Sequence, residues 1–200
     1  SEMLSGISHD LRTPLTRLKL QLAMLDQKDL SKKMSSDIDE MEKMLNDYLQ
    51  FAKTQAQEDT VDIELTKLFE EIRKNFDNDN ISISFNEKIN IKGRPISLKR
   101  SFENVIQNGI TYGKKVFINL QKTSSRVLII IEDDGPGIPE DQHKNVFKPF
   151  FRLDKSRSLN KAGVGLGLAI VEDIINSHGG SIQLNRSKFN GLQVKIFLPF

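Results

Sequence analysis

The stretch VLIIIEDDGPGI, residues 127–138, decides the fold of the larger part of this chain. It begins as an apolar, β-branched run, which is typical of a buried strand, and it ends as an acidic, glycine-rich loop. A second glycine loop, GVGLGL at residues 163–168, comes directly before an apolar pattern of helical period that runs from Leu166 to Ser177. A carboxylate where a strand ends and a glycine loop where a helix begins predict an α/β domain with a ligand site at these two ends.

The sequence around these loops alternates between helix and strand patterns from about Glu58 onward. We expect strands where apolar residues alternate or run together, and helices where they recur every three or four positions. The expected strands are Thr60–Glu64, Ile81–Phe85, Val116–Leu120, Val127–Ile131, Ile182–Leu184 and Leu192–Leu198, and the expected helices are Leu65–Asn75, Pro95–Thr111 and Leu166–Ser177. This order predicts an α/β sandwich over residues 58–200, with helices on one face of a mixed sheet.

The first 57 residues differ, because they contain one proline and one glycine and their apolar residues follow a 4-3-4-3 spacing. The spacing predicts two helices with apolar seams, formed by Leu11, Leu15, Leu18, Leu22 and Leu25 and by Met34, Ile38, Met41, Leu45, Tyr48 and Ala52. The short polar link at 26–31 favours an antiparallel hairpin. Two hairpins bury both seams in a four-helix bundle, so we expect a homodimer through residues 1–57; packing onto the rest of the same chain is the alternative.

The charge balance and the lack of cysteine exclude several classes of protein. Lys and Arg number 29 against 27 Asp and Glu, and this net charge of +2 lacks the basic excess of a nucleic-acid-binding domain. Without cysteine the chain has no disulfide, no cysteine-ligated metal and no thiol nucleophile. No apolar run approaches the roughly 18 residues of a membrane span.

Both glycine loops carry groups that suit a nucleotide. Asp133 can accept a hydrogen bond from an exocyclic amine such as that of adenine, and the glycines allow close approach. The loop at 163–168 offers backbone N–H groups to phosphate. The order of the motifs excludes a dinucleotide fold, and no glycine precedes Lys and Ser or Thr at the spacing of a Walker loop. Singly each loop is consistent with an ordinary turn, but together they predict a nucleotide site.

Asn104 and Asn108 lie four residues apart on the expected helix Pro95–Thr111 and therefore share one face. Their carbonyl oxygens suit Mg²⁺, which completes its octahedron with waters and phosphate oxygens. Without the two glycine loops, ordinary surface amides would be the better interpretation.

The run SHDLRTP at residues 8–14 contains a candidate nucleophile, His9. On a helix His9 lies about 200° around from the seam residue Leu11, so we expect an exposed imidazole. Asp10 can accept a hydrogen bond from one ring nitrogen, which raises the nucleophilicity of the other. Thr13 shares the face of His9, and its hydroxyl can orient a water toward a group attached to the ring. An exposed histidine without a role is the alternative.

Between the glycine loops, the stretch VFKPFFR at residues 146–152 and the polar residues after it resemble a lid over a nucleotide. We expect Phe147 in the core and Arg152 near phosphate, with a solvated basic loop as the alternative. His143 has no predicted role, and His178 has none beyond its favourable place at a helix end.

These motifs together resemble the cytoplasmic core of the sensor histidine kinases, over both of its domains. The similar stretches are His9–Pro14 for the H-box, Phe102–Tyr112 for the N-box, Asp133–Ile138 for the first glycine box, Phe147–Phe151 for the F-box and Gly163–Leu168 for the second glycine box. All five occur in the family's order. Within the family the likeness is greatest to the bacterial osmosensor type.

The resemblance implies a dimerisation and phosphoacceptor domain at residues 1–57 and a catalytic ATP-binding domain at 58–200, joined by a hinge near 55–60. It implies ATP-dependent autophosphorylation of His9, flanked by Asp10 and Thr13, and transfer to an aspartate of a response-regulator receiver domain. It also implies phosphatase activity toward that regulator. The implied place is the cytoplasmic portion of a bacterial inner-membrane protein, anchored upstream of residue 1, and the implied signal is osmotic.

The resemblance further implies ATP and Mg²⁺ as cofactors, with the metal on Asn104 and Asn108. The implied nucleotide-binding residues are Asn104, Asn108, Gly109, Ile110, Thr111, Tyr112, Asp133, Gly135, Gly137, Ile138, Arg152, Leu153, Gly163, Val164, Gly165, Leu166, Gly167 and Leu168.

Two other classes stay open beside this one. ATPase clamps of the gyrase, Hsp90 and mismatch-repair kind share the asparagine and glycine boxes and hydrolyse ATP with a glutamate on the nucleotide helix. Glu103 keeps that alternative open, although the hairpin with His9 argues against it. A module that keeps the boxes and only docks a regulator is the third class. Thr111 stands where relatives often have Lys or Arg, so that phosphate contact is either missing here or supplied by Lys114.

Overall fold

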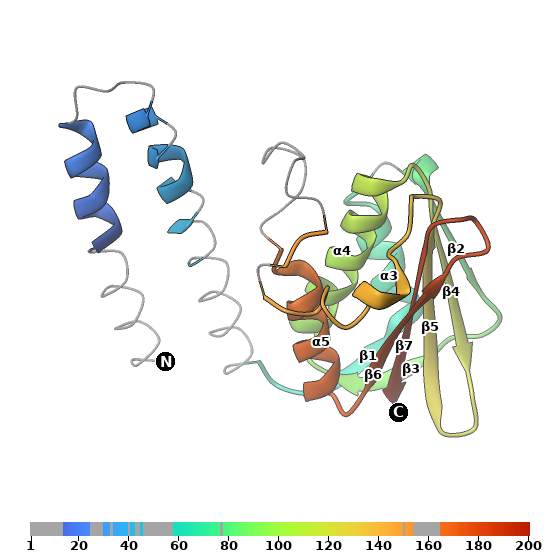
Figure 1. Cartoon of the computed structure of the whole chain (residues 1–200). Coiled ribbons are helices and arrows are strands. Elements are labelled where there is room, and N and C mark those ends of the chain that lie inside the picture. The colour runs from blue at the N-terminus through green and yellow to red at the C-terminus, as the bar shows by residue number, and fades with distance from the viewer. Residues whose placement is uncertain are drawn as a thin grey trace. The chain divides into compact units, whose positions relative to one another are not determined.

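The computed structural model describes residues 14–24, 30–32, 34–39, 41–42, 45, 58–76, 78–149, 151–153 and 165–200 (Figure 1). The chain divides into two compact units, Ser1–Gln57 and Glu58–Phe200.

The described part of the first unit is a helical hairpin. Residues 14–23 are helical, as are 30–32, 34–39, 41–42 and 45. Leu15, Leu22 and Ile38 form a buried cluster between the two segments. The Lys19 ammonium lies 2.7 Å from Asp39 and 2.6 Å from Glu42, and the Ser31 hydroxyl donates to the carbonyl of Leu22. Contacts that pair 22 with 31 and 19 with 39 and 42 show that the two segments run antiparallel, as the short polar link at 26–31 predicts.

The second unit is built on a five-stranded mixed sheet in the order β2-β4-β5-β7-β6. Its strands are β2 (Ile81–Phe85), β4 (Val116–Lys122), β5 (Arg126–Asp133), β6 (Ser181–Arg186) and β7 (Leu192–Pro199). β2 runs parallel to β4, and the other neighbours are antiparallel. The strands predicted from the apolar runs at 116–120 and 127–131 are thus confirmed as β4 and β5, which pair as an antiparallel hairpin.

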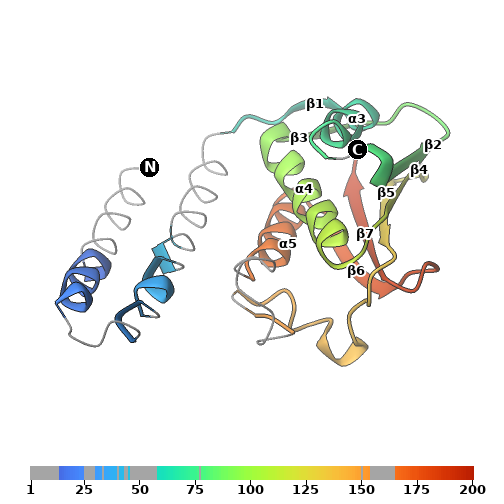
Figure 2. The same cartoon turned by 90° about the horizontal axis from the view of Figure 1, so that it is seen from above.

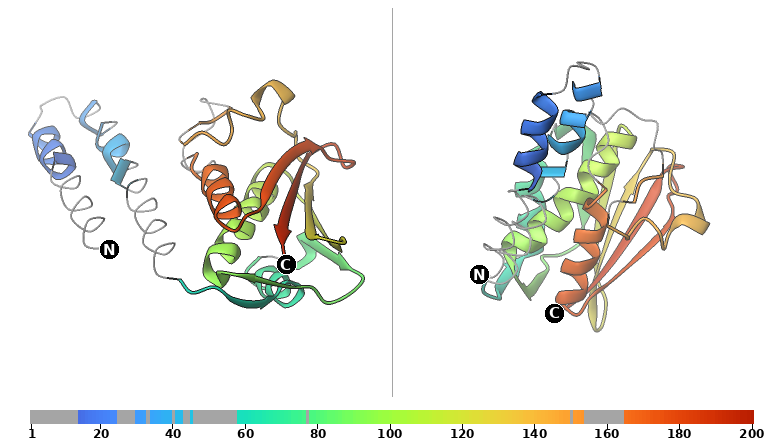
Figure 3. Two further views of the ribbon diagram at one scale, coloured as in Figure 1. Left: turned by 90° about the horizontal axis from the view of Figure 1, so that it is seen from below. Right: turned by 60° about the vertical axis from the view of Figure 1, so that its left-hand side comes forward.

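Three helices cover one face of this sheet: α3 (Leu65–Arg73), α4 (Pro95–Tyr112) and α5 (Gly167–Ser177) (Figures 2 and 3). α4 turns a stripe of small and apolar residues to the sheet, at Ser97, Leu98, Ser101, Phe102, Val105, Ile106 and Gly109. The rings of Phe69 and Phe102 stack 4.6 Å apart and join α3 to α4. The predicted α/β sandwich is confirmed.

A separate two-stranded sheet pairs β1 (Val61–Glu64) with β3 (Asn90–Gly93) in antiparallel register. The sequence did not predict β3, because Asn, Lys and Gly leave Ile91 as its only strongly apolar residue. Two short 3-10 turns, Asn78–Asn80 and Glu140–Gln142, complete the described elements. The expectation for Phe147 was wrong: it is half-buried, and its neighbour Val146, 7% exposed, occupies the core.

Candidate nucleotide site

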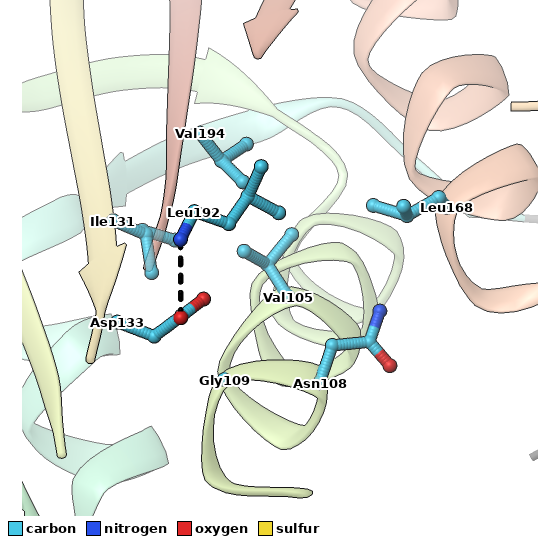
Figure 4. A pocket seen from close by; sticks show the side chains of 8 residues that line it. All are labelled: Val105, Asn108, Gly109, Ile131, Asp133, Leu168, Leu192 and Val194. Atoms are coloured by element: carbon cyan, nitrogen blue, oxygen red, sulfur yellow. Dashed lines mark hydrogen bonds between the residues drawn. The ribbon is translucent and has the colours of Figure 1, made fainter. Parts of the chain in front are cut away.

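Asp133 ends β5 and lies at the centre of the candidate site. The residue is 9% exposed, and the backbone N–H groups of Gly135 and Leu192 donate to its Oδ1 at 2.8 and 3.1 Å. Burial raises the pKa of Asp133 above its ordinary value, against the effect of these two hydrogen bonds, and the nearby charge of Asp134 adds to the rise. Among the described residues none donates to Oδ2, so this oxygen remains to accept from a ligand (Figure 4).

Two glycines allow three chain segments to converge on Asp133. A Cβ at Gly191 would lie 2.1 Å from both the backbone oxygen and Oδ1 of Asp133, so no other residue fits without displacing the turn. Gly137 has a φ of 73°, in the left-handed region, and a Cβ there would lie 3.0 Å from the Gly191 carbonyl oxygen. Arg186 joins the same two segments, because its Nη1 donates to the Pro136 carbonyl at 3.0 Å.

Gly191 and Leu192 are site residues that the sequence analysis missed. Asn190 and Gly191, between two apolar runs, are a hairpin-turn signal, and Asn190 has a φ of 71°. This signal predicts the turn between β6 and β7, but it does not show that the turn reaches Asp133.

A small cavity lies beside Asp133, between α4, α5 and the sheet (Figure 4). Its lining residues are Val105, Asn108, Gly109, Ile131, Asp133, Leu168, Leu192 and Val194. The structure thus brings together residues from the asparagine helix and from both glycine loops. The cavity measures about 10 Å³, which is room for about one water. The cavity as it stands is too small for a purine base.

Asn108 presents its amide to this region. A Cβ built on Gly167 would lie 3.7 Å from its Nδ2, and Figure 4 shows the amide oxygen directed away from Leu168. Asn104, one turn earlier on α4, is half-buried. In the described part of the chain no group of three or more acidic, histidine or cysteine side chains could hold a metal. Two amide oxygens fit Mg²⁺ when phosphates and waters supply its remaining ligands.

Glu103 has a different neighbour. Asn75, just after α3, donates its Nδ2 to Glu103 Oε1 at 2.9 Å. Because Glu103 lies about 140° around the helix from Asn108, this contact holds the glutamate off the face that lines the cavity. The geometry argues against the hydrolytic glutamate of an ATPase clamp.

The last turn of α4 carries three predicted nucleotide residues, Ile110, Thr111 and Tyr112, which are not among those that line the described cavity. Thr111 Oγ1 donates to the carbonyl of Gln107 at 2.7 Å, so this hydroxyl is turned onto its own helix. Tyr112 is 45% exposed. The structure thus does not bring these three residues into the cavity at Asp133.

The turn after α4 is fixed by Asp134. Its Oδ1 accepts the backbone N–H groups of Lys114 and Lys115 at 2.7 and 2.9 Å, and these hydrogen bonds lower the pKa of Asp134. Lys114 is exposed, although its backbone N–H is held by Asp134.

Of the second glycine loop, the structure describes Gly165 onward. Gly165 has a φ of 79°, and Leu166, 5% exposed, is the N-cap of α5 without a side-chain hydrogen bond. Ile138 and Arg152 are half-buried, and Leu153 is 47% exposed. The predicted residues His9, Asp10, Thr13, Gly163 and Val164 lie outside the described residues.

His178 has a structural role that the sequence did not reveal. Its Nε2 accepts the backbone N–H of Arg94 at 3.0 Å, and its Nδ1 lies 2.7 Å from the carbonyl oxygen of Ile174. This pair of contacts requires a neutral ring with its proton on Nδ1. Burial lowers the pKa of His178 below its ordinary value. The ring therefore joins the end of α5 to the start of α4.

Two family descriptions match the chain. "His Kinase A (phospho-acceptor) domain" matches residues 1–57, and "Histidine kinase-, DNA gyrase B-, and HSP90-like ATPase" matches residues 93–200. The chain belongs to the histidine kinase family. The match of the hairpin decides this, since the second description also covers gyrase and Hsp90.

Curated relatives of this chain are sensor histidine kinases, and their sequences align with almost all of it. "Sensor histidine kinase GtrS" of Pseudomonas aeruginosa is 34% identical over 200 residues, which are 99% of this chain and 41% of GtrS. "Sensor histidine kinase CpxA" of Escherichia coli is 32% identical over 212 residues, which cover 98% of this chain and 46% of CpxA. The histidine kinase chain described here thus spans less than half the length of these relatives.

Solved structures agree with this fold. The NMR structure of the histidine kinase domain of the E. coli osmosensor EnvZ is 32% identical, with a TM-score of 0.54 over 69% of this chain and 87% of that one. The catalytic domain of histidine kinase ThkA is 28% identical, with a TM-score of 0.61 over 70% and 97%. EnvZ and CpxA are equally identical to this kinase, so the comparisons favour no particular stimulus.

Proposed function

We propose that this chain transfers the γ-phosphoryl group of ATP to His9 and then to an aspartate of a response-regulator receiver domain. In the first step a ring nitrogen attacks the γ-phosphorus, the bond to the bridging oxygen breaks, and ADP leaves. The observation that carries the proposal is the cavity at Asp133, where the asparagine helix and both glycine loops meet, in a chain whose first 57 residues match a phosphoacceptor family.

In this proposal Asp133 reads the base and the two glycine loops surround the rest of the nucleotide. Asp133 Oδ2 accepts the exocyclic amine of adenine, because Oδ1 is already held by two backbone donors. The remaining residues of the family motifs, from Asn104 to Tyr112 and from Gly163 to Leu168, border the sugar and phosphates together with Arg152. Since the cavity now has room for about one water, Leu168 and α5 have to move when the base enters.

Asn104 and Asn108 hold Mg²⁺ through their amide oxygens in the same proposal. The ion, when bound, neutralises charge on the β- and γ-phosphates during transfer. The two asparagines orient it from one face of α4, and no carboxylate cage is needed because the phosphates complete the shell.

We also propose that the kinase is a homodimer through residues 1–57. Three residues of the predicted seams are open to solvent in the single chain: Leu18 at 45%, Met34 at 42% and Met41 at 51%. A groove of about 390 Å³ runs between the helices, lined by Leu18, Gln21, Leu22, Met34, Asp37 and Ile38. A second hairpin covers this groove and completes a four-helix bundle.

Phosphatase activity toward the regulator is part of the proposal, with Asp10 and Thr13 beside His9. Thr13→Ala is expected to autophosphorylate normally but to remove phosphate from the regulator more slowly, because the hydroxyl that orients the water is gone. The measurement is loss of label from a purified phosphorylated receiver domain. An unchanged rate excludes Thr13 from this role.

The test of the main proposal is incubation with radiolabelled ATP and Mg²⁺. We expect acid-labile, base-stable label on the wild-type chain and none on His9→Gln. Hydrolysis of ATP without labelling of the protein supports an ATPase clamp. The absence of both labelling and hydrolysis supports a docking module. Either result refutes the kinase assignment of this site.

Membrane anchoring upstream of residue 1 and an osmotic signal stay predictions. Within the part of the chain that the structure describes, no helix is both long and apolar enough to cross a bilayer.

A further inference from the structure

Glu132, the neighbour of Asp133 on β5, is a buried carboxylate to which the proposed function gives no role. The residue is 7% exposed. Its Oε1 accepts three hydrogen bonds, from Ser187 Oγ at 3.2 Å, from the Lys188 backbone N–H at 3.3 Å and from Gln193 Nε2 at 3.0 Å. Because successive residues of a strand point to opposite faces, Glu132 lies on the face of the sheet away from the cavity.

Two of the donors to Glu132, Ser187 and Lys188, belong to the turn between β6 and β7, and the third, Gln193, lies on β7 just after it. The same connection leads into Leu192, whose N–H is one of the two groups that hold Asp133. Ser187, 4% exposed, closes this turn: its N–H donates to the Gly191 carbonyl at 2.9 Å and its hydroxyl accepts from the Phe189 N–H at 3.0 Å. The next residue after Gly191 is Leu192, whose N–H donates to Asp133 Oδ1. One turn therefore lies between two carboxylates, anchored by Glu132 and contacting Asp133.

A second contact holds the same turn over the outer face of the sheet. The ring of Phe189 stacks on Phe117 with centroids 3.8 Å apart. Phe117 is the β4 residue directly opposite Glu132 in the register. The polar anchor and the aromatic anchor are thus side by side, and loss of the polar one leaves the turn attached but less closely positioned.

We propose that Glu132 is a positioning residue for base recognition. By fixing the turn at residues 187–192, it keeps the Leu192 N–H on Asp133 Oδ1 and leaves Oδ2 directed to the exocyclic amine of the base. With Leu192 displaced, the Gly135 N–H alone is satisfied by either carboxylate oxygen, and the carboxylate is no longer held in one orientation. This inference rests on the proposed role of Asp133 as the reader of adenine.

The test compares ATP with purine riboside 5′-triphosphate, which lacks the exocyclic amine, as ligands of the full chain. The ratio of their dissociation constants measures base recognition. In Glu132→Ala we expect the preference for ATP to fall about tenfold, while binding of the amine-free nucleotide and the autophosphorylation rate at saturating ATP change less than about twofold. Glu132→Gln retains an accepting oxygen and is expected to keep the wild-type ratio. Glu71→Ala, an exposed glutamate of α3, is the matched control.

Equal weakening of both nucleotides in Glu132→Ala means a merely structural role and overturns the inference, as does a tenfold loss in Glu132→Gln. If Glu132→Ala does not fold, Ser187→Ala removes only the hydroxyl that Glu132 holds. A lowered ratio in Ser187→Ala supports the inference, and an unchanged ratio overturns it. Asp133→Asn distinguishes failure of the proposed base recognition from failure of the positioning role. An unchanged ratio in Asp133→Asn refutes recognition of the base by Asp133 itself. A lowered ratio in Asp133→Asn, together with a wild-type ratio in the Glu132 variants, refutes only the positioning role of Glu132.

Discussion

Replacement of Glu58 by alanine is expected to destabilise the second unit by about 2 kcal/mol, because Glu58 caps α4. Its Oε1 accepts the backbone N–H of Ile96, and its Oε2 accepts the N–H and the hydroxyl of Ser97 at 2.9 and 2.7 Å. The N-cap residue itself, Arg94, makes no side-chain cap, and Pro95 has no N–H to satisfy. Glu58, which is distant in the sequence, therefore supplies the N-terminal side-chain cap that Arg94 and Pro95 do not provide.

The magnitude follows from three contributions that share one carboxylate. A lost N-cap costs about 1 kcal/mol, a lost charge at a partly buried helix N-terminus up to about 1 kcal/mol more, and the unpaired hydroxyl of Ser97, a residue only 2% exposed, about 1 kcal/mol. Because water partly replaces the carboxylate, the sum is nearer 2 than 3 kcal/mol. For a unit of this size that corresponds to a fall in Tm of about 4–8 °C.

The assay combines thermal unfolding with amide hydrogen exchange, in which Ile96 and Ser97 are expected to lose protection first. Asp59→Ala removes the adjacent exposed carboxylate and is the matched control. Glu58→Gln keeps one accepting oxygen and loses both the second oxygen and the charge, so its stability is expected to lie between those of Glu58→Ala and Asp59→Ala. A loss below about 0.5 kcal/mol in Glu58→Ala, with both amides still protected, would refute the capping role.

Three further predictions follow from single residues. Because burial lowers the pKa of His178 in the folded chain, the unfolded chain is protonated first as the pH falls, so stability is lost from about pH 6.5 downward to the lower folded value. Urea unfolding of His178→Asn is expected to lack this loss, and an equal pH dependence contradicts it. Gly137→Ala is expected to cost about 1–2 kcal/mol, because its φ is 73°, and to weaken ATP binding in calorimetry; wild-type affinity contradicts this. Leu18→Asp, in the hairpin groove, is expected to sediment as a monomer, whereas Leu20→Asp, more exposed but outside the groove, stays dimeric; two dimers contradict the interface.

Most of the fold of the second unit was predictable because its helices and strands have recognisable patterns in their local sequence. Pro95 begins α4 at the expected place, and the runs at 116–120 and 127–131 are too rich in β-branched residues for a surface helix. β3 was not predictable, since a four-residue strand with one buried isoleucine exists only through its pairing with β1, which lies far away in the sequence. Hydrogen bonding to a strand that is distant in the sequence gives so short a stretch no apolar pattern of its own.

The candidate site was predictable where side chains define it and not where the backbone does. The motifs pointed to Asp133, Asn108 and Leu168, which line one cavity. The motifs did not point to Leu192, because its contribution is an N–H group that every residue except proline possesses. Nor did they point to His178, whose contact with Arg94 depends on how α5 is aligned with α4.

The contacts of Glu58 also bear on the hinge expected near residues 55–60. The sequence predicts a hinge near residues 55–60, but Glu58 is bonded to the first turn of α4 and belongs to the second unit. α4 is held again at its far end, where Asp134 fixes the turn after it. In the proposed function, a helix fixed at both ends, with Asn104 and Asn108 between them, serves as a rigid support for the nucleotide. A change that opens the cap at Glu58 therefore acts directly on the helix that carries both asparagines.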